Sequence, residues 1–201
     1  LITSVVFIGQ LIGSCFFGPL SDSYGRHKAF ALSSIIITLG GVLSGVATNY
    51  TTLLVYRALV GFGVGGAFVP YDLLAEFLPN SHRGRFLIYI EVFWTIGSMF
   101  VAGTAWLCLS LFGWRVLALI TAIPVGLASL GCVLLLPESP RWLIIKGRAN
   151  EAKEILVTAA KINGQEIDDD FVLSENINPD KNPSICEFLH PDHRNISIPL
   201  W

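Results

Sequence analysis

Charged residues are missing from long stretches of this sequence. None occurs in residues 1–20 or in residues 29–48, and only 14% of the 201 residues are Asp, Glu, Lys or Arg. The hydrophobic share of 53% is correspondingly high, and together these values lie outside the usual range for a soluble globular domain. The net charge of −2 gives no sign of a nucleic-acid partner.

Cysteine is also scarce. Cys15, Cys108 and Cys132 fall inside apolar stretches, and Cys186 lies in a polar stretch near the end. This spacing provides neither a disulfide framework nor a set of metal ligands, so we expect no metal and no cofactor. No residue set typical of catalysis occurs, and we expect no enzymatic activity. An initiator Met and a signal peptide are missing too, and because Leu1 already lies in an apolar stretch we expect a fragment.

Long apolar runs are what the sequence has in abundance. A helix needs roughly 20 apolar residues to cross a hydrocarbon core. Five stretches meet this length, at about 1–20, 29–48, 51–75, 86–112 and 116–136. Helices satisfy their own backbone at that depth. We therefore predict an all-α membrane protein with a five-span bundle over residues 1–143 and the lipid bilayer as a partner.

The sequence after the fifth apolar run is more polar. Apolar residues recur there at helical spacing, at Ala152, Ile155, Leu156 and Ala159. We expect an amphipathic helix within residues 144–165. Residues 166–201 contain Asn, Pro and acidic residues without periodicity, which predicts a polar linker.

Basic residues cluster on one side of the predicted bundle. Cytoplasmic loops carry an excess of Lys and Arg, which sets the orientation of a membrane protein. On one side lie Arg26, Lys28, Arg83, Arg85, Arg141, Lys146 and Arg148, whereas Arg57 and Arg115 fall toward the other. We expect the first side to face the cytoplasm, so that the amphipathic helix and the linker are cytoplasmic.

A polar turn, G-P-L-S-D-S-Y-G-R-H-K, separates the first two apolar runs at residues 18–28. It resembles the signature loop between the second and third helices of the major facilitator superfamily. The resemblance implies that Gly18 lets two helices approach closely, that Asp22 caps the following turn and faces a helix N-terminus, and that Gly25 supplies the tight reversal.

Three further strings resemble the sugar-porter-like branch of that superfamily. They are R-A-L-V-G at 57–61, E-F-L-P with a following R-G within 76–84, and P-E-S-P-R-W-L at 137–143. Their order assigns the five spans to helices two to six of a twelve-helix transporter, whose C-terminal half would be a partner missing from this chain. The sequence A-E-F-L-P-N-S-H-R-G-R resembles that of the synaptic-vesicle-protein-like, niacin and organic-ion transporters more closely than that of glucose carriers.

The resemblance also implies a cytoplasmic gate that holds in one transport state and breaks in the other. Its expected members are the charged residues Asp22, Arg26, Asp72, Glu76, Arg83, Glu138 and Arg141. Arg suits a gate because its planar fork pairs at two points with a carboxylate and stays charged. The alternative is that these charges are solvated or anchor the chain at the membrane surface. Gly61 and Gly65, like Gly18 and Gly25, are expected to allow close helix packing.

Charges inside the spans indicate function more sharply, because a central ion costs about 2.5–3.5 kcal/mol or more. Arg57, Asp72 and Glu91 are such residues. Arg57 lies roughly 9 Å from the outer end of its span, so its long side chain could also extend to the membrane–water interface. Asp72 is four residues before Glu76 and shares its helix face, which favours the gate.

Glu91 is the strongest candidate for contact with a substrate or a coupling proton. It matches the position where the sugar porters carry a substrate-binding Gln, and a carboxylate there favours a cationic or proton-coupled substrate. A bond to a neighbouring helix without ligand contact is the alternative. Trp94 and Thr95 on the same span, and Gln10 on the first, are further candidates, with ordinary packing as their alternative.

The family transports solutes by alternating access, in which two halves rock about a central site. We therefore expect a multi-pass protein of the plasma or vesicle membrane. The expected function is secondary active transport of a small organic solute: an organic cation, or an aromatic or other organic acid, with protons as a candidate coupling ion. The alternatives are a facilitative sugar carrier, a vesicle structural or receptor protein of the same fold without flux, and a truncated product that interferes with the full protein.

Overall fold

The computed structural model describes residues 1–78 and 80–164, with the side chains of residues 80–82 left aside. The regular elements of this part are eight α-helices. The predicted linker at 166–201, which contains Cys186, lies outside the described residues. Five helical segments are long and apolar enough to cross a membrane, which confirms the prediction of an all-α protein with five spans.

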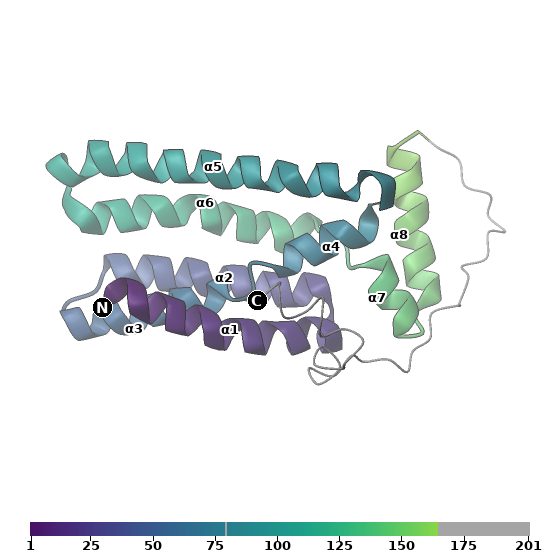
Figure 1. The fold of residues 1–201 in the computed structure, drawn as a ribbon, viewed down its shortest axis with the longest axis horizontal. Helices are drawn as coiled ribbons and strands as arrows, with labels where there is room; N and C mark the ends of the chain where they lie inside the picture. Colours follow the sequence, from purple (N-terminus) through teal and green to yellow (C-terminus); the bar gives the residue numbers. More distant parts are fainter. Residues whose placement is uncertain (79, 165–201) are drawn as a thin grey trace, which may run out of the picture.

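The five spans lie side by side along the long axis of the molecule (Figure 1). The first two are α1 (Ile2–Tyr24) and α2 (Arg26–Gly45). The third consists of α3 (Tyr50–Val64) and α4 (Val69–Phe77), and the last two are α5 (Asn80–Leu111) and α6 (Gly113–Leu135). We call the end where α1 meets α2 the basic end, and the end where α2 meets α3 the far end.

The third span is interrupted, whereas the sequence predicted one continuous helix over 51–75. Residues 65–68 form a turn between α3 and α4. Their amides bond three residues back, as in Gly66 N to Gly63 O at 2.9 Å and Ala67 N to Val64 O at 2.9 Å. Pro70 stands in the first turn of α4 and has no amide hydrogen to continue the α-helical pattern. Two adjacent glycines and a proline therefore divide the span.

Glycines bring α1 and α3 into backbone contact. A Cβ atom at Gly13 would overlap the carbonyl oxygen of Phe62, and one at Gly61 would overlap that of Val6. Gly65 lies equally close to the backbone of Gly13. Small residues at helix interfaces allow such an approach in membranes. The α1–α3 pair is therefore held by backbone proximity.

Gly18 does not take part in the packing of α1 against α3, and its expected role in helix approach stays a prediction. Among the described residues, no atom outside its chain neighbours and its own helix backbone lies within 4 Å of a Cβ atom placed at Gly18. Gly18 is exposed, and the close approach on α1 is made one and two turns earlier, at Gly13 and Gly9. The physical reason is the helical period, since residue 18 points away from the face that carries residues 9 and 13.

The helices α2 and α6 pack together through small and polar residues. The hydroxyl of Ser34 donates to that of Ser129 at 3.0 Å, and both side chains are buried. Gly41 lies against Ala122, where an added Cβ would be 3.2 Å from the alanine Cβ. A cross-helix hydrogen bond of this kind contributes about 0.6 kcal/mol on average in a membrane.

The long helix α5 is the most exposed span. It packs mainly along α6, and every residue from 91 to 103 is exposed. The exposed side chains include Phe93 and Trp94, each 71% accessible. An apolar face of this size is normal only where lipid or further helices cover it.

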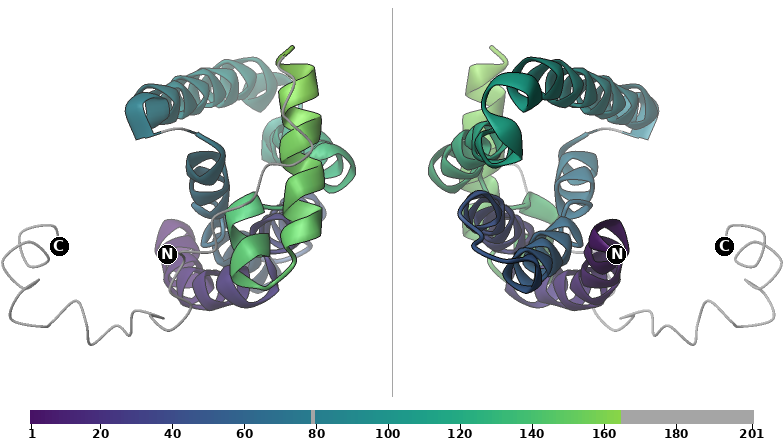
Figure 2. Two further views of the ribbon diagram at one scale, coloured as in Figure 1. Left: turned by 90° about the vertical axis from the view of Figure 1, so that its right-hand side faces the viewer. Right: turned by 90° about the vertical axis from the view of Figure 1, so that its left-hand side faces the viewer.

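Two shorter helices cover the basic end. They are α7 (Pro140–Ile145) and α8 (Ala149–Ile162), and α8 runs across the direction of the spans (Figures 1 and 2). Trp142 and Leu143 of α7 form a small buried core with Ala152 of α8. At the start of α8, Arg148 pairs with Glu151 through two contacts of 2.6 Å, which raise the pKa of the arginine.

Gly13→Ala is expected to destabilise the bundle, and Gly18→Ala is its control on the same helix. The added methyl at position 13 meets backbone that cannot rotate away, and overpacking of this kind costs about 1–3 kcal/mol. At position 18 the methyl meets no described atom outside its chain neighbours, so no comparable overpacking is expected. In the full-length protein in detergent, the thermal transition should fall for the first variant and hold for the second. A Gly13→Ala protein as stable as the parent would contradict the close contact.

Candidate functional site

The carboxylate of Glu138 binds the first turn of α2. Its Oε1 atom accepts hydrogen bonds from the backbone amides of Arg26 at 2.8 Å and His27 at 3.1 Å. It also accepts one from its own neighbour, Ser139 N, at 3.0 Å. The first amides of a helix have no partners within it and carry partial positive charge, so an anion there is stabilising. Glu138 thereby ties the segment after α6 to the start of α2.

Gly25 makes room for this carboxylate. Its φ of 110° lies in the region that favours glycine. A Cβ atom at this position would overlap Oε2 of Glu138 and lie 2.8 Å from its Cδ. Residue 25 therefore needs to be glycine for two reasons, the backbone turn and the space for Glu138.

Asp22 does not cap α2, which corrects the role implied for it. The N-cap position of α2 is Gly25, without a side-chain cap from within that turn. Because α1 continues to Tyr24, Asp22 lies in the last turn of α1 and not at the start of α2. Its carboxylate pairs instead with Arg26 Nη1 at 2.9 Å, and its side chain is 71% exposed.

Arg26 is the centre of a charge network at the basic end. Its Nη1 atom also donates to the carbonyl oxygen of Ser21 at 3.0 Å, and its Nε atom lies 3.4 Å from Oε1 of Glu76. The side chains of Arg26 and Glu76 are only 16% and 13% exposed. Arg26 thus joins α1, α2 and α4 through one guanidinium group.

Two buried atoms of this network, Arg26 Nε and Glu76 Oε2, have no hydrogen-bond partner in the described part of the chain, and Arg26 Nε is near Glu76 but poorly aligned. The Nε atom of Arg83 is also buried without such a partner, and Arg83 forms no ion pair with any described residue. Buried polar atoms without partners are uncommon and costly. The network is therefore able to accept further donors and acceptors.

The remaining gate candidates make fewer contacts with the charge network around Arg26. Asp72 lies one turn before Glu76 on α4 and shares with Asp22 a pocket of about 190 Å³. Arg141, on α7, is exposed and forms no ion pair with any described residue. The structure therefore brings Asp22, Arg26 and Glu76 together, places Glu138 at the same helix start and leaves Arg141 apart.

Two bonds at the basic end were not expected from the sequence. The indole Nε1 of Trp142 donates to the carbonyl oxygen of Asp22 at 2.9 Å, and the ring Nε2 of His27 lies 3.1 Å from the carbonyl oxygen of Cys132. The first bond fastens α7 to the end of α1, and the second fastens α2 to α6. The only signal in the sequence was that Trp142 and His27 belong to the matched motifs.

Glu91 is bonded to a neighbouring helix. The hydroxyl of Tyr71 on α4 donates to Glu91 Oε1 at 3.0 Å, and Thr95 Oγ1 donates to the Glu91 carbonyl oxygen at 3.1 Å. The Glu91 side chain is otherwise exposed, and within the described residues Oε2 has no hydrogen-bond partner. One oxygen is therefore occupied by Tyr71, and the other is accessible.

Of the other substrate candidates, only Thr95 contacts Glu91 within the described residues, whereas Trp94 and Gln10 lie apart from it. Trp94, one turn further along α5, lines an open groove of about 640 Å³ between α5 and α6. Gln10 is half-buried on α1, which packs mainly on α3 and lies across the bundle from α5 (Figures 1 and 2). Within the described residues no group of three or more His, Cys, Asp or Glu could hold a metal ion.

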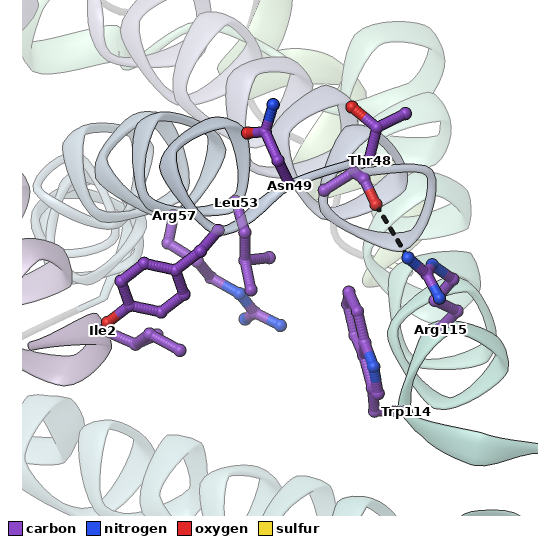
Figure 3. Close-up of a pocket in the computed structure, with 9 residues that line it drawn as sticks. Ile2, Thr48, Asn49, Leu53, Arg57, Trp114 and Arg115 are labelled. Carbon is purple, nitrogen blue, oxygen red and sulfur yellow. Dashed lines mark hydrogen bonds between the residues drawn. The ribbon is translucent and has the colours of Figure 1, made fainter.

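Arg57 lies at a pocket of about 520 Å³ at the far end. Figure 3 shows its guanidinium directed into the space that Trp114 and Leu53 border. The pocket is formed by the start of α1, the α2–α3 connection and the start of α6. Arg57 and the charge network therefore lie at opposite ends of the bundle.

This chain belongs to the family described as Sugar (and other) transporter, which matches residues 1–182. It is 39% identical over 87% of its length to organic cation/carnitine transporter 7 of Arabidopsis thaliana, and 36% identical over its whole length to a synaptic vesicle 2-related protein of Xenopus laevis. It is 34% identical over 86% of its length to the niacin transporter NiaP of Acinetobacter baylyi. The matches cover 35%, 36% and 39% of those proteins, so the chain spans less than half of each.

The fold is that of the major facilitator superfamily. A partially occluded, inward-open structure of the xylose transporter XylE from E. coli aligns with 79% of this chain at a TM-score of 0.70 and 23% identity, and 42% of XylE is covered. A structure of the same protein, described as a proton:xylose symporter, aligns at a TM-score of 0.67. This is a family of membrane transporters and not of enzymes.

Glu138→Ala should destabilise the basic end by about 0.5–2 kcal/mol, the usual cost of losing a helix N-cap. Three amides lose their acceptor, so the thermal transition of the full-length protein should fall. Glu138→Gln keeps an acceptor oxygen without the charge and should lie between the parent and the alanine variant.

Glu154→Ala is the matched control for this prediction. Glu154 is exposed on α8, and its removal should leave the transition near that of the parent. Equal melting temperatures for the two alanine variants would show that Glu138 does not hold the start of α2.

Proposed function

We propose that the intact protein is a secondary active transporter of a small organic solute, which works by alternating access. The observation that carries this proposal is the charge network in which Arg26 joins three helices at the basic end. A static scaffold has no need of charge pairs that can separate, whereas a rocking bundle needs contacts that hold one state and release another.

In this proposal the basic end faces the cytoplasm and acts as the gate. Two buried atoms of the network, Arg26 Nε and Glu76 Oε2, lack hydrogen-bond partners among the described residues. Charged or polar groups from the rest of the protein could satisfy them in one state and withdraw in the other. The bond between Trp142 and Asp22 would keep α7 attached to the gate during this change.

Glu91 is proposed as the group that binds substrate or a coupling proton. Its side chain is exposed, its Oε1 accepts a hydrogen bond from Tyr71, and its Oε2 has no hydrogen-bond partner among the described residues. The relatives support an organic solute, because one is named for organic cations and carnitine and another for niacin. A proton:xylose symporter among the structures of the same fold is compatible with proton coupling.

Glu91→Gln should abolish the pH dependence of uptake by the full-length protein, because the amide has no carboxylate that could carry a coupling proton. The measurement is the uptake of radiolabelled nicotinate and carnitine into cells or proteoliposomes between pH 5.5 and pH 8. Tyr71→Phe is the matched variant: it removes the bond to Glu91 without removing the carboxylate, and should keep a pH dependence.

A parent protein that carries no solute tested, at a normal level in the membrane, would support the alternative of a vesicle structural or receptor protein. The likeness to a synaptic vesicle 2-related protein is the observation that keeps this alternative open. If the parent transports and Glu91→Gln retains its full pH profile, transport stands and the role of Glu91 is wrong.

Arg26→Gln should lower the maximal uptake rate about tenfold, which corresponds to roughly 1.4 kcal/mol of lost gate interaction. Arg85→Gln, at an exposed arginine near the start of α5, is the control and should transport at the parent rate. Equal rates for both variants at equal surface expression would argue against a gate at Arg26.

A further inference from the structure

The helices α2 and α6 meet along a seam that lies wholly within this chain (Figure 1). The buried hydroxyl of Ser34 donates to that of Ser129 at 3.0 Å. Seven residues further along α2, a Cβ atom at Gly41 would lie 3.2 Å from that of Ala122, which stands seven residues earlier on α6. Residues seven apart fall on one helix face. The two antiparallel helices therefore keep the same faces in contact over about two turns.

Both ends of α2 are bonded by charged residues that flank α6. At the basic end, Oε1 of Glu138 accepts from the amides of Arg26 at 2.8 Å and His27 at 3.1 Å. At the far end, Nη2 of Arg115 in the first turn of α6 donates to the carbonyl oxygen of Ala47 at 3.1 Å, just past the end of α2 (Figure 3). A helix start carries partial positive charge and a helix end partial negative charge, so both flanking residues have the stabilising sign. We call these two end contacts and the seam between them the α2–α6 clamp.

Opening the clamp at the basic end would be costly. Withdrawal of Glu138 would leave the amides of Arg26 and His27 without their acceptor. Separation of α2 from α6 there would also part the His27 ring from the carbonyl oxygen of Cys132, which lies 3.1 Å from Nε2. Polar groups that lose a partner away from water cost free energy. The clamp is therefore unsuited to a contact that opens in each transport cycle.

The contact between Arg26 and Glu76 has the opposite character. Nε of Arg26 lies 3.4 Å from Oε1 of Glu76 but is poorly aligned, and over residues 1–78 and 80–164 neither this Nε nor Glu76 Oε2 has a hydrogen-bond partner. Buried polar atoms normally have partners, so these two are open to groups from the rest of the protein. An exchange of partners is therefore expected at the side chain of Arg26, and not at its backbone, which Glu138 holds.

We propose that Glu138 is a positioning residue for the gate and does not itself open. In every transport state it holds the start of α2 against α6, and thereby keeps the guanidinium of Arg26 at the place where the gate forms. The inference rests on the proposed transport function. It separates Glu138 from the gate residues predicted from the sequence, because their contacts would part in one state whereas that of Glu138 would not.

A double-mutant cycle tests whether Glu138 acts through Arg26. Glu138→Ala should lower the maximal uptake rate of the full-length protein about tenfold, as Arg26→Gln does, because the guanidinium is no longer held in place. The double variant should also lose about tenfold, and not about a hundredfold, because each change removes the same positioned group. Glu138→Gln keeps an acceptor oxygen for the two amides and should recover part of the rate.

Glu154→Ala, at an exposed residue of α8, is the control for this cycle. It should transport as the parent does, and it should leave the effect of Arg26→Gln unchanged. Rates are compared at equal amounts of protein in the membrane. A loss of about a hundredfold in the double variant of Glu138 and Arg26 would overturn the positioning role, since the two residues would then act separately.

A cross-link tests whether α2 and α6 stay together during transport. Ser34→Cys and Ser129→Cys are combined in full-length protein whose native cysteines are replaced by alanine, and iodine is used to form the disulfide. The hydroxyl oxygens at these positions are 3.0 Å apart, so the bond requires only a small adjustment. The cross-linked protein should transport at the rate of its reduced form. Loss of transport on cross-linking, restored by a reducing agent, would show that the helices separate and would overturn the proposal.

Failure of the proposed function would give a different result. If the parent carries no solute tested, the clamp is measured without turnover, through the reaction of a single cysteine with N-ethylmaleimide. Ser34 is only 5% exposed, so the cysteine of Ser34→Cys should react faster in the Glu138→Ala background than in the Glu154→Ala background. Equal reaction rates would overturn the clamp whether or not the protein transports.

Discussion

The basic end of this bundle depends on one carboxylate placed against the start of one helix. Glu138 follows the last span in the chain, yet it accepts the first amides of α2, more than 100 residues earlier. This contact explains why Gly25 has no room for a side chain and why α7 begins directly beside the end of α1. The motif at 18–28 and the motif at 137–143 are therefore two parts of a single structural unit.

Arg26 uses the geometry that Glu138 creates. Because its backbone is held in the first turn of α2, its side chain can reach Asp22 and Glu76 at the same time. Two carboxylates around one guanidinium compensate the cost of partial burial, while the unpaired atoms of Arg26 and Glu76 keep the network unsaturated within the described residues. A strong and complete ion cluster would hold the bundle in one state, whereas an incomplete one can exchange partners.

The sequence predicted the number of spans and the helix at the basic end well, because apolar length and helical period depend on local composition. It predicted the interrupted third span poorly, since hydropathy does not respond to a glycine pair and a proline within an apolar run. The contacts of individual residues were the least predictable. Asp22 was assigned a capping role by its place in the motif. In the structure α1 continues to Tyr24, so Asp22 lies within α1, and Glu138 accepts the first amides of α2 instead. Gly18 was assigned close packing, but the helical period places it off the face of α1 that meets α3, so no contact in the described residues tests that role.

The interrupted span has a thermodynamic consequence. The helix α3 is fixed to α1 by backbone contacts, whereas the nine residues of α4 carry both Tyr71, which binds Glu91, and Glu76, which pairs with Arg26. Any rotation of this short rod about the turn at 65–68 alters both contacts together. Ligand binding at Glu91 and closure of the gate at Arg26 are therefore thermodynamically coupled. Each changes the free energy of the other by the same amount.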